Sequence, residues 1–297
     1  MPDETSLINI GDLAKPVTAL IEKIADATGV LYEPRRIRKL AKAEADAELI
    51  KAESQIEITA IQRRALTRFV QEEGKKQENI EDIIEEAIPL LNENSTPENI
   101  EDDWTANFFD KCRIVSDKEI KSLWSKVLAG EANNPNSFSK RTVNFLASLD
   151  KSDAELFTSL CGFSFFCGEI IPIIYDIENI IYNNTGINFS SLAHLETIGL
   201  INLSELGYLR KGKFQSLPMY YYGEHFVAEF ETEQVNTIKI GQVLLTQTGE
   251  QLAKICNSQS VEGFVDYVIE NWIEEQRLKV WSPFPRIDNQ TTQKNAP

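Results

Sequence analysis

Histidine and cysteine, the residues that most often bind zinc or act as nucleophiles, are scarce in this chain of 297 residues. It has two histidines, His194 and His225, and four cysteines. Cys161 and Cys167 are closely spaced in "CGFSFFC", but no second pair accompanies them. We therefore expect no metal site, and we predict free thiols, mostly buried in apolar helical patterns, in a reducing cytoplasm.

Catalytic signatures are also missing. The sequence contains no glycine-rich phosphate-binding loop, no H-E-x-x-H and no G-x-S-x-G. Acidic pairs such as Glu101 and Asp102 are adjacent, and adjacent side chains on a helix point in different directions. We name no catalytic residue and no cofactor and favour a non-enzymatic protein. An enzyme with carboxylates dispersed along the chain stays open as an alternative.

Positive charge is in short supply. The chain has 30 Lys and Arg against 46 Asp and Glu, which gives a net charge of -16 and a pI near 4.7. Such a surface repels phosphates, so a general polyanion binder is excluded. No apolar run approaches the roughly 18 residues that a membrane-spanning helix needs. The start lacks the basic and apolar regions of a secretory signal, so we predict a cytoplasmic protein.

Residues 1–33 form a predicted amphipathic N-terminal segment. Within it, 11–29 has the pattern of a helix with Leu20 and Ile24 on its apolar face. That face would pack on a protein core or partner, or alternatively lie on a membrane surface.

A basic cluster follows in "EPRRIRKLAK". Its cations either pair with acids further along the same helix or bind an anionic partner, such as lipid headgroups or nucleic acid. Lipid binding would place the protein peripherally at the inner face of the membrane. The candidate binding residues here are Arg35, Arg36, Arg38 and Lys39.

Residues 34–76 are rich in strong helix formers and predict one long helix with a thin apolar stripe. A thin stripe fits a helical hairpin or an intersubunit coiled coil, so we expect a homo-oligomer. Gly74 is expected to interrupt the helix.

Residues 77–168 predict a bundle of short helices. Ser116 and Glu119 have the spacing of a capping box, and Gly130 is expected to end that helix. The run from Glu78 to Asp110 carries eleven acids and no Lys or Arg. We expect this run to be solvated or to dock a basic patch.

A helix capped by Ser137 or Ser139 opens with Lys140 and Arg141, against the helix dipole. One interpretation is that these cations pair with Glu131 or with the acidic run. The other is that they bind an anion together with the free N–H groups of the helix start.

Residues 169–282 show a short helix, a strand at "GLI", two further strands and a closing helix at "LTQTGEQL", the order of a winged helix-like module. Gly223 and Gly241 are expected to punctuate the strands. The predicted fold is thus mainly α, with a long N-terminal helix and helical bundle followed by a small α+β winged helix-like module. A polar tail, 283–297, is expected to be loose.

The helix that would enter a DNA groove carries Glu196 and neutral His194, so nucleic acid is the less favoured partner. Cations interleaved with aromatics do follow, and they either bind single-stranded nucleic acid or form a wing loop with buried aromatics. The candidates are Arg210, Lys211, Lys213 and Tyr221.

Four stretches carry a resemblance over about residues 11–260, and the strings "WSKVLAGE" and "SFSKRT" are its most specific parts. The chain resembles an uncharacterised bacterial domain-of-unknown-function family whose N-terminal part is similar to the abortive-infection alpha proteins. This resemblance implies a bacterial cytoplasmic protein, often carried on mobile or defence islands, and no established catalytic residue.

Together these observations predict an interaction or effector protein in phage defence. It would act by oligomer assembly and by contact with the membrane, a protein partner or a phage component. The alternative is a winged helix-type nucleic acid-binding regulator.

Overall fold

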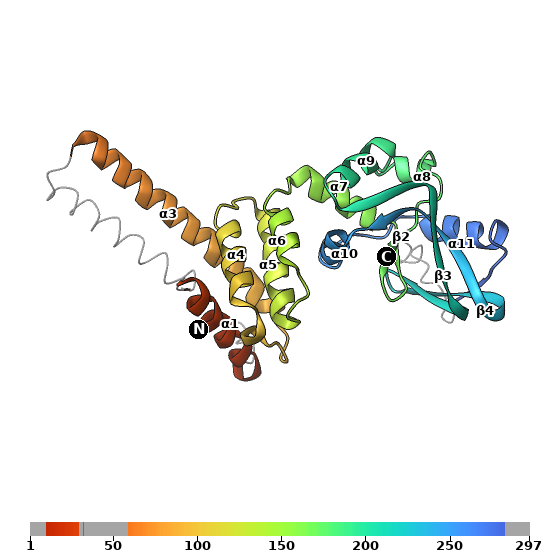
Figure 1. Ribbon diagram of the computed structural model, residues 1–297, viewed down its shortest axis with the longest axis horizontal. Coiled ribbons are helices and arrows are strands. Elements are labelled where there is room, and N and C mark those ends of the chain that lie inside the picture. Colours follow the sequence, from red (N-terminus) through yellow and green to blue (C-terminus); the bar gives the residue numbers. More distant parts are fainter. Residues whose placement is uncertain (1–9, 30–31, 33–58, 283–297) are drawn as a thin grey trace, which may run out of the picture. The chain divides into compact units, whose positions relative to one another are not determined.

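The protein is described by a computed structural model that covers residues 10–29, 32 and 59–282 (Figure 1). The chain divides into two compact units, Met1–Leu149 and Asp150–Pro297. The predicted binding residues Arg35, Arg36, Arg38 and Lys39 lie outside the described residues, as does the tail 283–297.

The first unit is helical. Its main core cluster is aromatic, with the rings of Trp104 and Trp124 each centred 5.0 Å from that of Phe108. Helix α3 packs on α5, while α1 and α6 pack on α4. The elements are α1 (Ile10–Thr28), α3 (Ala60–Ala87), the 3-10 turns η1 (Ile88–Leu90) and η2 (Pro97–Asn99), α4 (Asp102–Cys112), α5 (Lys118–Asn133) and α6 (Lys140–Leu146).

The predicted helix over 11–29 is confirmed as α1. It ends before Gly29, whose positive φ of 69° suits a helix terminus. Leu20 and Ile24 are buried, and α1 contacts α4. Its apolar face therefore packs on the protein core, the first of the two expected alternatives.

The prediction of one unbroken helix over 34–76 is wrong. Thr59 is extended, with φ -64° and ψ 156°, and it begins α3 through a capping box. Its side chain accepts a hydrogen bond from the Gln62 N–H, and the Gln62 side chain accepts one from the Thr59 N–H at 2.9 Å. The T-x-x-Q spacing of Thr59 and Gln62 is the sequence pattern of a capping box, which marks the beginning of a helix. The helix-favouring composition of residues 34–76 led to the prediction of one helix across it.

Gly74 does not interrupt the helix, and the expected boundary between residues 76 and 77 falls inside α3. A glycine inside a helix costs only about 1 kcal/mol. The burial of Ile83 and Ile84 further along the same helix outweighs that cost, since a buried isoleucine contributes about 2 kcal/mol.

Two expected helix ends in the bundle are also displaced. Asp117, not Ser116, caps α5, by accepting hydrogen bonds from the Glu119 and Ile120 N–H groups. The helix continues through Gly130 to Asn133. Gly130 serves close packing, because a Cβ there would lie 2.5 Å from the Phe138 ring.

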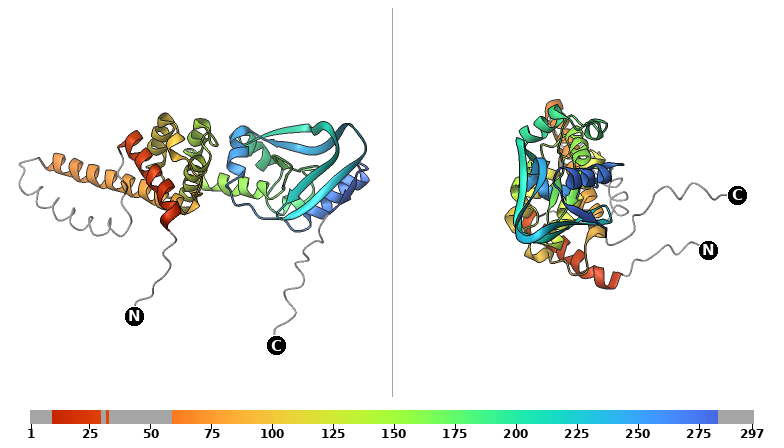
Figure 2. Two further views of the ribbon diagram at one scale, coloured as in Figure 1. Left: turned by 90° about the horizontal axis from the view of Figure 1, so that it is seen from below. Right: turned by 90° about the vertical axis from the view of Figure 1, so that its right-hand side faces the viewer.

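The second unit combines helices with a five-stranded antiparallel sheet in the order β2-β1-β3-β4-β5. Strands β3 and β4 form a long hairpin that curves along its length (Figure 2). The elements are α7 (Lys151–Cys161), β1 (Ser164–Phe166), β2 (Ile170–Pro172), α8 (Ile180–Asn183), α9 (Phe189–Thr197), β3 (Ile201–Tyr221), β4 (Glu224–Leu245), α10 (Gln247–Ala253), α11 (Phe264–Glu274) and β5 (Lys279–Trp281).

The predicted fold class is therefore wrong for the C-terminal half, which is sheet-rich rather than a small winged helix-like module. Gly223 does lie in a tight turn, but Gly241 lies within β4. The strands pair on both sides of a register shift between Leu203 and Tyr208, where Gly207 and Gly241 have positive φ. Bulges of this kind bend a strand without ending it. The segment from helix α7 to strand β1, which the sequence analysis assigned to the bundle of 77–168, belongs to this second unit.

The backbone of Gly241 lies very close to the backbone of Ile174. The Gln242 N–H donates to the Ile174 carbonyl at 2.7 Å, and a Cβ on Gly241 would lie 2.2 Å from that same oxygen. With φ at 103°, the position excludes a side chain both by space and by backbone conformation.

We expect Gly241→Ala to lower the free energy of unfolding by at least about 3 kcal/mol, because strain in the backbone adds to a backbone clash. Gly223→Ala is the matched control, since its φ is also positive but its Cβ would meet nothing within 4 Å. That control should lose only about 1–2 kcal/mol. Urea denaturation followed by circular dichroism measures both, and equal losses would contradict the role of the Ile174 contact.

Candidate interaction site

Helix α3 has one apolar face, and its C-terminal half is buried. Ile83, Ile84 and Ala87 are fully buried, and Ile80 is nearly so. This half packs on α5 and α4. It is the ordinary amphipathic arrangement of a helix on a core.

The N-terminal half of the same face is exposed. Phe69 precedes Ile80 by three helical turns and Val70 precedes Ile84 by about four, so these residues lie on one side of α3. Here, however, Phe69 is 59% exposed. This half of α3 extends beyond α4, α5 and α6 (Figure 1). The exposed α3 face consists of Ile61, Leu66, Phe69 and Val70.

An open groove lies where the exposed and buried halves meet. It has a volume of about 400 Å³ and lies between α1, α3 and α4. Ile80 and Phe109 supply apolar lining, and Lys76, Asp110 and Arg113 supply charged lining. On α3 this hollow separates the exposed apolar residues from the buried ones, and its lining carries both signs of charge.

Lys140 and Arg141 begin α6, which Ser139 caps by accepting the Thr142 N–H. Lys140 Nζ lies 3.5 Å from Asp103 Oδ2, so it pairs with an acid of the predicted acidic run. Both side chains of that pair are largely exposed, and Arg141 is exposed as well. Exposed pairs contribute at most about 1 kcal/mol, so this contact is a weak one.

The four residues considered for nucleic acid do not form one surface. Arg210 donates to the Cys167 carbonyl at 3.0 Å and pairs with Glu169. Lys211 and Lys213 are exposed on β3.

Tyr221, the fourth of these residues, is buried. Its hydroxyl donates to the Gly162 carbonyl at 2.9 Å and accepts the Val261 N–H at 2.7 Å. Its ring is therefore part of the core and offers no face on which a base can stack.

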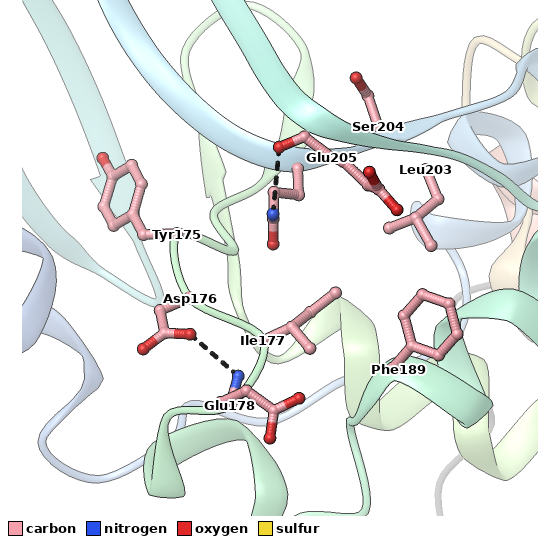
Figure 3. Close-up of a pocket in the computed structure, with 9 residues that line it drawn as sticks. Tyr175, Asp176, Ile177, Glu178, Phe189, Leu203, Ser204 and Glu205 are labelled. Carbon is pink, nitrogen blue, oxygen red and sulfur yellow. Dashed lines mark hydrogen bonds between the residues drawn. The ribbon is translucent and has the colours of Figure 1, made fainter.

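The second unit has a hollow of about 230 Å³ next to β3 (Figure 3). Ile177, Leu203 and Phe189 point toward one another there. Carboxylates of Asp176, Glu178 and Glu205 also line it. Sequence reasoning missed this hollow because its residues come from four separate stretches of the chain.

One carboxylate of the hollow, that of Asp176, has a structural partner. Asp176 Oδ1 accepts the Glu178 N–H at 3.0 Å, which is a local turn contact. Across residues 10–29, 32 and 59–282, no group of three His, Cys, Asp or Glu is placed to bind a metal ion. Over the same ranges, no helix is both long enough and apolar enough to cross a membrane.

The fold defines a two-unit protein, helical in one half and sheet-rich in the other, with large apolar side chains exposed on α3. The chain belongs to the family described as "Protein of unknown function (DUF2806)", whose model matches residues 63–269. This match confirms the uncharacterised family expected from the sequence. It begins inside α3 and ends inside α11, so it includes both units. No curated protein and no solved structure matches the chain.

The two halves of the α3 face should differ in their effect on stability. Ile83→Ala should lower the free energy of unfolding by about 2–5 kcal/mol, because it leaves a cavity in the core. Phe69→Ala should change it by no more than about 0.5 kcal/mol, as surface substitutions do. Urea denaturation at protein concentrations where light scattering gives a monomer measures both. A large loss for Phe69→Ala would show that its side chain is covered within the chain.

Proposed function

We propose that this chain is a non-enzymatic interaction protein that self-associates through the exposed α3 face, and that the assembly acts as an effector in phage defence. One observation carries the proposal: four large apolar side chains, Ile61, Leu66, Phe69 and Val70, are exposed on the N-terminal half of α3, whereas the bundle buries the apolar residues of its C-terminal half. Soluble monomers rarely expose large apolar side chains in one stripe.

The charges on α3 and on the rest of the chain favour a second copy of the chain as the binding partner of the exposed α3 face. Arg68 pairs with Glu72 of the same helix, and two further arginines of α3, Arg63 and Arg64, are exposed. The chain as a whole is strongly acidic, with a net charge of -16. A second copy thus offers both a matching apolar stripe and carboxylates for these arginines, as flanking charges do beside a helical seam.

The step to phage defence is supported by the resemblance of the N-terminal part to abortive-infection alpha proteins. The family match assigns no activity, so the defence role depends on that resemblance alone. The second candidate, a nucleic acid-binding regulator, is supported only by the exposed Lys211 and Lys213.

Light scattering tests the assembly. We expect the wild type to exceed the monomer mass at micromolar concentration and the double variant Ile61→Glu, Phe69→Glu to be monomeric, because a buried charge without a partner opposes association. Ile114→Glu is the matched control, since Ile114 and Ile61 are both 68% exposed but Ile114 lies off this face. The control should assemble as the wild type does.

A wild-type monomer at that concentration would contradict self-association.

Plaque counting tests the biological role. Cells that express the wild type should give fewer plaques for some phages than cells with the empty vector. The Ile61→Glu, Phe69→Glu variant should restore the plaques, and the Ile114→Glu control should keep them low. Equal counts across a broad panel would contradict the defence role, and nucleic-acid binding at graded salt by the wild type and by Lys211→Glu, Lys213→Glu would come next.

A further inference from the structure

Two cysteines that are far apart in the sequence meet in the second unit. Cys161 is the last residue of α7, and Cys256 follows α10. Thr158 Oγ1 donates to the Cys256 carbonyl at 3.5 Å, which places this end of α7 against the segment after α10. The two side chains are close enough that each shifts the pKa of the other, and the Cys256 thiol donates to the Ala253 carbonyl at 3.5 Å. Both are free thiols, Cys161 buried and Cys256 partly exposed.

Tight backbone contacts hold the two segments together. A Cβ on Gly162 would lie 2.8 Å from the Gln259 carbonyl oxygen, so the backbones of the two segments approach closely. The Tyr222 hydroxyl hydrogen-bonds with the Ser258 hydroxyl at 2.6 Å and lies 3.4 Å from the Cys161 carbonyl oxygen.

The two turns beside the thiols contain non-glycine residues in a left-handed conformation. Asn257, directly after Cys256, has φ 56°, and Tyr222 has φ 43°. Such positions persist only where surrounding contacts determine them, and they concentrate at functional sites. The proximity of the two sulfurs is thus a constrained feature of the fold.

A hollow of about 220 Å³ reaches Cys161 from the surface, and Cys256 is itself partly exposed. Cys161, Ser164, Tyr222 and Ser258 contribute to the lining of the hollow. Ser164 is only 8% exposed, and its hydroxyl has no hydrogen-bond partner in the part of the chain that the structure describes. An unpaired hydroxyl beside a thiol suits a small polar molecule that can accept or donate a hydrogen bond.

The two sulfurs differ in acidity. The hydrogen bond with the Cys161 side chain is the main cause that lowers the pKa of Cys256 to about 7, and contacts with Ser258 lower it further. Burial raises the pKa of Cys161, Cys112 and Cys167. Near neutral pH, Cys256 is therefore the cysteine that is substantially ionised, and the thiolate is the nucleophilic form.

We propose that Cys161 and Cys256 form a redox-active thiol pair that hydrogen peroxide converts to a reversible disulfide. The Cys256 thiolate attacks one peroxide oxygen, the O–O bond breaks, and the leaving hydroxide takes up a proton to become water. Cys256 is then a sulfenic acid. The Cys161 sulfur attacks the Cys256 sulfur, the S–O bond breaks, and the hydroxyl leaves as water with the Cys161 proton. The two thiols lose two electrons, which reduce the peroxide, and a small thiol reverses the disulfide by exchange.

Thiol counting on the wild-type protein tests the proposal directly. The reduced protein is treated with hydrogen peroxide, alkylated after denaturation and mapped by peptide mass spectrometry. We expect two of the four thiols to be lost in one Cys161–Cys256 disulfide that dithiothreitol reverses, with Cys112 and Cys167 still alkylated. The oxidation rate should rise with pH and reach half its maximum near pH 7, because the thiolate population rises through the pKa of Cys256.

Three single variants separate the two roles. Cys256→Ser should abolish the peroxide reaction. Cys161→Ser should leave a sulfenic acid on Cys256 that a sulfenic-acid probe labels. Cys167→Ser is the control and should react as the wild type does. The proposal is overturned if peroxide leaves all four thiols intact, or if the wild type stops at a sulfenic acid on Cys256 with Cys161 still alkylated.

Discussion

The apolar face of α3 is the constraint on which the first unit depends. Its buried half holds α3 on α5 and α4, and the aromatic cluster around Phe108 fills the space between α4 and α5. Because an α-helix keeps its periodicity, the same face continues toward Ala60 whether or not a neighbour covers it. The length of the helix thus creates both the stability of the bundle and the exposed surface from which we infer self-association.

In the second unit the corresponding constraint is an aromatic core under the long hairpin. The ring of Phe165 lies near those of Tyr221, Phe226 and Trp272. The Tyr221 hydroxyl also joins the Gly162 carbonyl to the Val261 N–H. This one buried group therefore connects the end of α7 to the segment that follows Cys256. The two cysteines therefore lie in neighbouring segments because Tyr221, a residue of the core, binds both segments.

The two inferences concern separate units. Assembly depends on the exposed α3 face in the first unit, and thiol chemistry depends on Cys161 and Cys256 in the second. Neither requires a bound metal or a catalytic carboxylate. A chain that senses an oxidant with one half and associates with the other is consistent with an effector that responds to a change in its surroundings.

The sequence by itself determined the local features. The amphipathic pattern of α1, the cap at Ser139 and the turn at Gly223 were all legible, because each depends on a few neighbouring residues. The scarcity of His and Cys also led correctly to the expectation of free thiols. The stripe on α3 was predicted as well, but the point where its burial ends was not, since burial depends on which helices pack against it.

The tertiary structure decided the rest. Gly241 has the sequence signature of a strand end, yet it is a bend within β4, because Ile174 lies against its backbone and the pairing with β3 resumes beyond it. The winged helix-like prediction failed at this point. Cys161 is spaced in sequence to suggest a relation with Cys167, whereas the cysteine that affects its pKa is Cys256. Contacts between segments that are distant in the sequence leave no pattern in neighbouring residues. They are specified only by the way in which the core packs in the folded protein.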